Sequence, residues 1–200
     1  MRLFALALAA LLPAAAADAP NGKIVGNPNA PMRLEVFSDF SCPGCKNFHE
    51  QTLPILMKEF VGPGKAFIVF RDYVLPPSPG HEHSPEAARF AVAANRVGKY
   101  MAVADALFQQ QVSWAMSGKV WEAVAPVLTP GEQKKVQELY KAPSVADEVK
   151  RDTDTGNRAG LAKTPTVGIN YGKEHRLWNE WTPANGNAFF LDYLRSLLKK

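Results

Sequence analysis

Residues 35–45 read EVFSDFSCPGC and join a predicted strand to a predicted helix. The strand is expected over residues 32–37, where most side chains are apolar. The helix is expected over residues 43–61, because apolar side chains recur there at spacings of three and four. Cys42 and Cys45 therefore lie where the chain leaves the strand and enters the first helical turn.

The spacing of the two cysteines suits an exchangeable thiol pair at a helix N-terminus. If Cys42 is the N-cap, Pro43 occupies the first helical position, where its missing N–H costs nothing. A thiolate at Cys42 then accepts hydrogen bonds from the free N–H groups of Gly44 and Cys45, and the helix dipole favours the same charge. We therefore expect a lowered pKa at Cys42, which attacks a disulfide, while Cys45 resolves the mixed disulfide.

Three other interpretations of the pair stay open. A purely structural disulfide would enclose two residues and so restrain little chain entropy. A metal site would join the two thiolates to His49, His81 or His83, although zinc sites normally show a second ligand pair at a recognisable spacing. A chance pairing of two cysteines is disfavoured if the chain is exported, because free thiols oxidise outside the cytoplasm.

The rest of the chain alternates strands and helices. A second strand is expected at residues 66–70, and its apolar composition predicts a central place in the sheet. Pro54 should kink or split the first helix, residues 75–80 resemble a linker, and Ser84 before Pro85 indicates a helix N-cap. The other expected elements are a short strand at 24–25, helices at 84–112, 118–128, 130–140 and 144–160, strands at 166–169 and 176–178, and a helix at 183–198.

This order of elements predicts an α/β layered fold. The first strand–helix–strand unit should form a parallel pair. The helical block at roughly residues 76–160 contains no strand pattern, and we interpret it as an insertion into the layered fold.

Composition narrows the class of protein. The chain has 200 residues, of which 46% are hydrophobic and 21% charged, as in an ordinary globular chain of about one domain. Two cysteines cannot form a disulfide-dense scaffold or a four-thiolate zinc site. The net charge is +4 without a long run of Lys or Arg, so we expect these charges on a solvated surface and no binding of nucleic acid.

The first segment has the pattern of a secretory signal peptide. Arg2 precedes an apolar run at residues 3–12, and small residues at 15–17 follow. The apolar run is far shorter than the roughly 20 residues that span a bilayer. We expect removal of residues 1–17, by cleavage between Ala17 and Asp18, and a soluble mature domain over 18–200 that is periplasmic or secreted.

Two motifs together resemble the exported thioredoxin-fold proteins of the DsbA-like group. Residues 35–45 are similar to their active-site stretch, and Lys163-Thr164-Pro165-Thr166-Val167 resembles their loop with a cis-proline before a strand. The resemblance covers roughly residues 22–198 and implies a thioredoxin-like fold with a helical insertion. It also implies that the Thr164–Pro165 bond is cis, lies against Cys42 and presents backbone groups to an extended substrate.

The resemblance adds a candidate acid. Thioredoxin-fold proteins often carry a buried carboxylate under the resolving cysteine, which implies that Glu35 accepts the proton of Cys45. Glu35 is one residue further from the cysteines than in thioredoxin itself, so the connecting loop must be longer. The alternative is a solvent-facing strand residue. Asp39 is nearer to the cysteines, and we interpret it as a loop residue.

The resulting hypothesis is an exported thiol–disulfide oxidoreductase that donates the Cys42–Cys45 disulfide to reduced client proteins. It needs no other cofactor and is expected to be a monomer, and the resemblance implies a quinone-linked membrane protein as the partner for reoxidation. Gly44 cannot stabilise the thiolate as a histidine could, which predicts weaker oxidising power than in a Cys-Pro-His-Cys relative. A reductase, an isomerase and a non-catalytic binding protein of metal or of a partner remain the alternatives.

Overall fold

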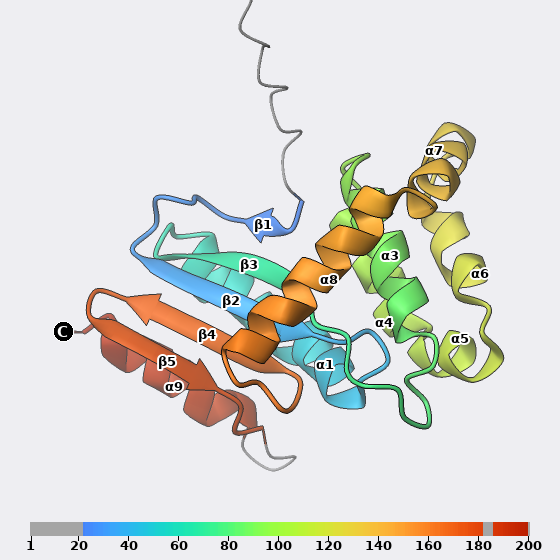
Figure 1. The fold of residues 1–200 in the computed structure, drawn as a ribbon. Helices are drawn as coiled ribbons and strands as arrows, with labels where there is room; N and C mark the ends of the chain where they lie inside the picture. Colours follow the sequence, from blue (N-terminus) through green and yellow to red (C-terminus); the bar gives the residue numbers. More distant parts are fainter. Residues whose placement is uncertain (1–21, 182–185, 200) are drawn as a thin grey trace, which may run out of the picture.

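A computed structural model describes residues 22–181 and 186–199, so the predicted signal peptide lies outside the described residues. Within them, the centre is a five-stranded sheet of order β1-β3-β2-β4-β5 (Figure 1). The strands are β1 Ile24–Val25, β2 Met32–Ser38, β3 Ala66–Asp72, β4 Thr166–Tyr171 and β5 Glu174–Trp178. β2 runs parallel to β3 and antiparallel to β4, and β1 and β5 pair antiparallel at the edges.

The predicted strands and the parallel first unit are confirmed, and the longer strands extend one or two residues beyond their expected ends. β2 lies in the middle of the sheet, where Met32, Leu34 and Val36 are fully buried on one face. Because β2 is paired on both sides, its C-terminal end at Ser38 is held firmly, and the loop that carries the cysteines starts from this fixed point.

The first helical run covers the expected residues but changes its hydrogen-bond pattern. It consists of α1 Pro43–Asn47, a π-helical turn Phe48–Thr52 (η1), α2 Leu53–Leu56 and a second π-helical turn Met57–Val61 (η2). Pro54 has no N–H to donate, and its ring would collide with a carbonyl of the preceding turn of an α-helix. The wider turn before Pro54 accommodates the proline without ending the run, so the predicted kink takes the form of a π-turn.

Between β3 and β4 the described chain forms the helical insertion, which we define as α3–α8. Its helices are α3 Ser84–Asn95, α4 Tyr100–Gln109, α5 Gln111–Ser117, α6 Val120–Val124 with a 3-10 turn Ala125–Val127, α7 Pro130–Tyr140 and α8 Pro143–Arg158. The predicted α/β class and the helical insertion between β3 and β4 are therefore confirmed. α8 crosses one face of the sheet on its way back to β4 (Figure 1).

Two details of the helical prediction are wrong. The helix expected over 84–112 is broken twice: between α3 and α4, where Gly98 has a φ of +72°, a conformation that ends a helix, and at Gln110 between α4 and α5. Ser84 is the first residue of α3 and not its N-cap, because its hydroxyl donates to the buried carboxylate of Asp39. The last helix, α9 Gly186–Leu197, is present, while its expected start at Pro183 lies outside the described residues.

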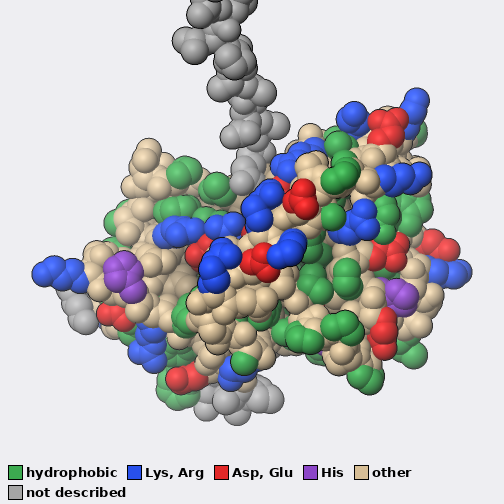
Figure 2. Space-filling model, viewed as in Figure 1, with side chains coloured by type: hydrophobic (Ala, Val, Ile, Leu, Met, Phe, Trp, Pro, Cys, Tyr) green, Lys and Arg blue, Asp and Glu red, His purple; other side chains and the backbone are tan. Residues whose placement is uncertain are grey.

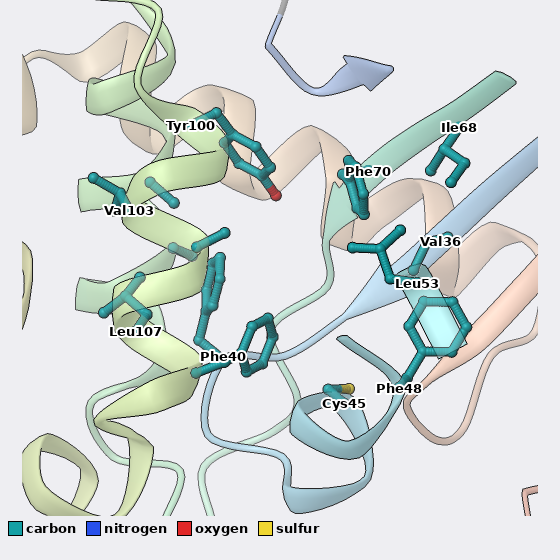
Figure 3. Packing of buried hydrophobic residues seen from close by; sticks show 14 of the residues in the cluster. Val36, Phe40, Cys45, Phe48, Leu53, Ile68, Phe70, Tyr100, Val103 and Leu107 are labelled. Carbon is teal, nitrogen blue, oxygen red and sulfur yellow. The ribbon is translucent and has the colours of Figure 1, made fainter. Parts of the chain in front are cut away.

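One hydrophobic core joins the sheet to the insertion. Side chains of β2 and β3 meet those of α1, α2 and α4 across this core (Figure 3). Phe40, in the loop after β2, packs on Phe108 of α4 with ring centroids 5.1 Å apart, and Phe70 lies 5.9 Å from Tyr100. The loop that carries the cysteines is thus anchored to the insertion by aromatic packing.

Charged side chains collect on the face that α8 crosses (Figure 2). A groove on this face is lined by Arg71, Arg96, Arg151, Arg158, Glu148 and Asp152. Lys23 also lines it but is only 3% exposed, and its ammonium group contacts the carboxylates of Asp72 and Asp152. The expectation of solvated charges is therefore wrong for Lys23, whereas Arg96, Arg151 and Arg158 are exposed. No helix among the residues described here is long and apolar enough to cross a membrane.

Candidate active site

Cys42 is the N-cap residue of α1, as the sequence predicts, although its thiol makes no side-chain capping hydrogen bond. Its backbone is extended, with φ −75° and ψ 120°, and Pro43 follows at the first helical position. The carbonyl of Cys42 accepts the N–H groups of Cys45 and Lys46 at 3.0 and 3.1 Å, which starts the helix. Cys42 is 9% exposed and Cys45 1%, and the two sulfurs are not bridged, so the structure describes the dithiol.

The surroundings of Cys42 favour its thiolate. A hydrogen bond from the Cys45 thiol lowers the pKa of Cys42 most, and burial opposes this effect. The Thr164 side chain and the backbone N–H groups of Cys45 and Gly44 lower the pKa further, to about 6. At pH 7 a pKa of about 6 corresponds to roughly ten thiolates for each thiol, so Cys42 is a nucleophile at neutral pH.

Cys45 has the opposite character. Complete burial raises the pKa of Cys45 well above its ordinary value, and a neighbouring Cys42 thiolate raises it further. The backbone N–H of Asp39 donates to the Cys45 sulfur at 3.4 Å. The two thiols therefore differ in ionisation and in access, which supports the expected roles of Cys42 as the attacking residue and Cys45 as the resolving residue.

The loop at Thr164 and Pro165 lies against the cysteines. The Thr164–Pro165 bond is cis, as the resemblance implies, and the Cys42 thiol donates to the Thr164 carbonyl at 3.4 Å. A Cβ atom added to Gly44 would lie 3.2 Å from the Pro165 ring, so a glycine permits this close approach. The Trp181 indole donates to the Pro165 carbonyl at 2.6 Å and holds the loop from the other side.

The prediction for Glu35 is wrong in its placement. Successive side chains of a strand point to opposite faces, so Glu35 lies on the face opposite to Val36. Val36 lines the same small cavity as Cys45, whereas the Glu35 carboxylate accepts hydrogen bonds from Arg33 at 2.9 Å and Arg71 at 2.7 Å. Glu35 therefore belongs to the charged face that α8 crosses and cannot take the proton of Cys45 directly.

Asp39 is the buried carboxylate of the cysteine loop, which sequence reasoning underrated. It is 2% exposed and accepts hydrogen bonds from the backbone N–H groups of Ser41 at 2.7 Å and Leu75 at 2.8 Å, and from the Ser84 hydroxyl at 2.5 Å. His81 lies 3.4 Å from the same carboxylate. Asp39 thus ties the loop to the segment after β3 and to the start of the insertion.

The histidines considered as metal ligands lie elsewhere. The imidazole of His49 contacts the Asp105 carboxylate at 2.6 Å and packs on Phe108, with ring centroids 4.7 Å apart. His81 faces Asp39, and the ring of His83 lies beside Gly118. The described residues contain no group of three or more His, Cys, Asp or Glu side chains arranged to hold a metal ion.

Comparison with known proteins places this geometry in a family. A family model described as thioredoxin matches residues 18–182. The disulfide bond formation protein D of Bacillus subtilis is 23% identical over an alignment of 156 positions, which covers 74% of this chain and 67% of that protein. The family match covers both the cysteine loop and the loop at Pro165.

Solved structures share the fold. Alpha-DsbA1 of Wolbachia pipientis superposes with a TM-score of 0.69 and 19% identity, covering 90% of this chain and 92% of that one. A thioredoxin-like oxidoreductase from Silicibacter pomeroyi superposes with a TM-score of 0.70 and 24% identity, covering 91% and 95%. Because these matches extend over nearly the whole of both chains, the helical insertion is part of the shared fold.

Proposed function

This chain belongs to the thioredoxin family as a DsbA-like thiol–disulfide oxidoreductase, and from that premise we propose that it oxidises exported client proteins. The group transferred is a disulfide between Cys42 and Cys45. The proposed compartment is the periplasm or the outside of the cell, and the proposed partner for reoxidation is a quinone-linked membrane protein. The pattern of residues 1–17 supports the export.

The observation that carries the oxidising direction is the stabilised Cys42 thiolate. A client thiolate attacks Cys42 of the disulfide, the S–S bond breaks, and Cys45 leaves and takes up a proton. A second client thiolate then attacks the client sulfur of the mixed disulfide, and Cys42 leaves as a thiolate. Two electrons pass from the client to the pair, and a leaving thiolate of low pKa makes this transfer favourable.

The client is expected to bind as an extended segment beside Cys42. The Thr164–Pro165 loop leads into β4, and the Thr164 carbonyl lies 3.4 Å from the Cys42 sulfur. An extended segment can add to such a backbone by main-chain hydrogen bonds, which need no particular side chain. This mode of binding suits a protein that acts on many different reduced chains.

The oxidising direction predicts that the reduced form is more stable to unfolding than the oxidised form at pH 7. The pKa of Cys42 is lowered in the folded protein, so its ionisation stabilises the reduced form against unfolding. This stabilisation is fully present above the unfolded pKa of about 9 and is lost as pH falls to about 6. The reduced form should gain about tenfold in its folding equilibrium constant for each pH unit from 6 to 9, relative to the oxidised form. The disulfide form contains neither titrating thiol and is the internal reference.

Chemical denaturation of both forms at pH 6, 7 and 8 measures this difference. A parallel assay mixes the disulfide form with a reduced, unfolded client in stoichiometric amount and follows oxidation of the client. The metal content is determined on the same sample. An oxidised form that is the more stable at every pH would favour a reductase. Reshuffling of a scrambled client without net oxidation would favour an isomerase, and inactivity with stoichiometric metal would favour a binding protein.

A histidine at position 44 should increase the oxidising power. Gly44→His places an imidazole at the N-terminus of α1, where a positive charge or a donor stabilises the Cys42 thiolate. The glutathione equilibrium should move about three- to tenfold toward the reduced protein. Gly44→Ala is the matched control, because it adds the same Cβ, 3.2 Å from the Pro165 ring, without the imidazole. Equal potentials for the two variants would contradict the prediction.

A further inference from the structure

A side chain of the insertion reaches the backbone of the cysteine loop. Gln111 is the first residue of α5 and is 4% exposed. Its amide nitrogen donates to the carbonyl of Phe40 at 2.7 Å and to the carbonyl of Cys42 at 3.0 Å. An amide NH₂ group has two hydrogens, so both of its donors are used by two carbonyls of one loop.

The second of these carbonyls is the one that starts the active-site helix. The Cys42 oxygen also accepts the N–H groups of Cys45 and Lys46 at 3.0 and 3.1 Å. Gln111 therefore acts on the peptide group that sets the orientation of Cys42 relative to α1. The side chain of Cys42 extends from the same residue and ends 3.4 Å from the Thr164 carbonyl.

Other contacts between the insertion and the loop do not reach the Cys42 backbone, and the hydrogen bond from Ser84 ends on the Asp39 side chain. Phe40 packs on Phe108 through ring faces, and such apolar contact tolerates small rotations. Lys46 donates to the Gln109 carbonyl at 3.5 Å, but this contact is exposed and long. Hydrogen bonds to two carbonyls are directional, so the Gln111 amide fixes the loop in one orientation.

We propose that Gln111 is a positioning residue, whose amide holds the backbone of Phe40 and Cys42 so that the Cys42 sulfur stays at the N-terminus of α1. The insertion thereby supports the nucleophile directly and does not only cover the sheet. The consequence for client oxidation rests on the proposed function, whereas the effect on the state of Cys42 is measurable without any client.

The test compares Gln111→Leu with Gln110→Leu. Gln111→Leu removes both hydrogen bonds at similar volume, which leaves the buried Phe40 carbonyl short of a donor and the Cys42 carbonyl with its two helix bonds alone. Gln110→Leu makes the same change one residue earlier, where the amide donates to the Ala123 carbonyl within the insertion. The thiolate absorbance of the reduced protein against pH gives the pKa of Cys42, and alkylation of Cys42 at pH 6 gives its reactivity.

We expect the acid dissociation constant of Cys42 to fall about three- to tenfold in Gln111→Leu and to stay unchanged in Gln110→Leu. A lower melting temperature in Gln111→Leu with an unchanged pKa of Cys42 would overturn the proposal, because a purely structural role predicts that result. If Gln111→Leu does not fold, Gln111→Met keeps the unbranched length of the side chain, carries no donor and adds no charge, and the same titration decides.

The two proposals fail in different ways. A wild-type protein that does not oxidise clients would refute the proposed function and leave the titration of Gln111→Leu interpretable. A wild-type protein that oxidises clients, together with a Gln111→Leu variant that titrates like wild type, would refute the positioning role alone.

Discussion

Cys42→Ser abolishes thiol–disulfide exchange, whereas Cys45→Ser keeps the first step and stops at the second. A serine hydroxyl is not ionised at neutral pH, so Cys42→Ser has no nucleophile at the helix N-terminus and its rate should fall to that of the uncatalysed reaction. In Cys45→Ser the Cys42 thiolate remains and attacks a disulfide, but no thiol of the protein can release it. A mixed disulfide should therefore accumulate.

Intact mass spectrometry after mixing with a small disulfide detects the mixed disulfide. The oxidation of a reduced, unfolded client measures turnover. Cys42→Ser should show no adduct, and Cys45→Ser should show one adduct per chain that a reductant removes. The double variant Cys42→Ser/Cys45→Ser is the control for reaction at any other site. An adduct on Cys45 in the Cys42→Ser protein, at the rate of wild type, would exchange the roles assigned to the two cysteines.

The Cys42–Cys45 arrangement could be predicted from the sequence because a helix cap is a local structure. Cys42, Pro43 and Cys45 lie within one turn, so their residue types determine which N–H groups are free and where the sulfur sits. The helical run and the strand before it are encoded in the same short stretch. The parallel pairing of β2 and β3 follows from the helix that must connect them.

Glu35 could not be placed by analogy, although its own strand contained the answer. Leu34 and Val36 are apolar and flank it, so the alternation of a strand sends Glu35 to the face opposite to them. The face of Leu34 and Val36 is the one on which the cysteine helix packs. The analogy with thioredoxin-fold acids outweighed this pattern, and the structure overturns it.

The contacts of Asp39 and Gln111 could not be predicted from nearby residues, because their partners are distant in sequence. Asp39 is 45 residues from Ser84, and Gln111 is 69 residues from Cys42. Such contacts depend on how the insertion returns to the sheet, which hydrophobic periodicity does not specify. The same limit applies to Lys23, whose carboxylate partners come from β3 and α8.

Lys23→Met should destabilise the protein by about 3–5 kcal/mol, because removing one partner of a buried ion cluster leaves uncompensated charge. The Lys23 ammonium contacts Asp72 at 2.7 Å and also contacts Asp152, and both carboxylates are 2% exposed. The Tyr100 hydroxyl donates to Asp72 at 2.6 Å and does not replace a cation. Chemical denaturation at pH 7 measures the loss, and Lys150→Met, at an exposed pair with Asp154, is the matched control and should leave the midpoint unchanged.

The pH dependence of the Lys23→Met loss identifies its cause. Burial lowers the pKa of Lys23, but the nearby carboxylates of Asp72 and Asp152 outweigh burial and raise it. The stabilisation that the Lys23 charge provides is therefore complete at neutral pH and is lost only in strong alkali. Burial raises the pKa of Asp72 even with Lys23 present. Without the ammonium the carboxyl binds a proton on folding, which makes folding more favourable as pH falls.

The loss in free energy of unfolding of Lys23→Met relative to wild type should therefore become smaller as pH falls from 7 to 5. Lys23→Met/Asp72→Asn should recover part of the loss at pH 7, because it removes one of the two stranded charges while Arg71 still donates to Asp152 at 2.9 Å. A deficit that is equal at both pH values, with no recovery in the double variant, would assign the loss to packing of the lysine stem. The cluster links Lys23, directly before β1, to Asp72 of β3 and Asp152 of α8, so the same charges tie one helix of the insertion to the sheet.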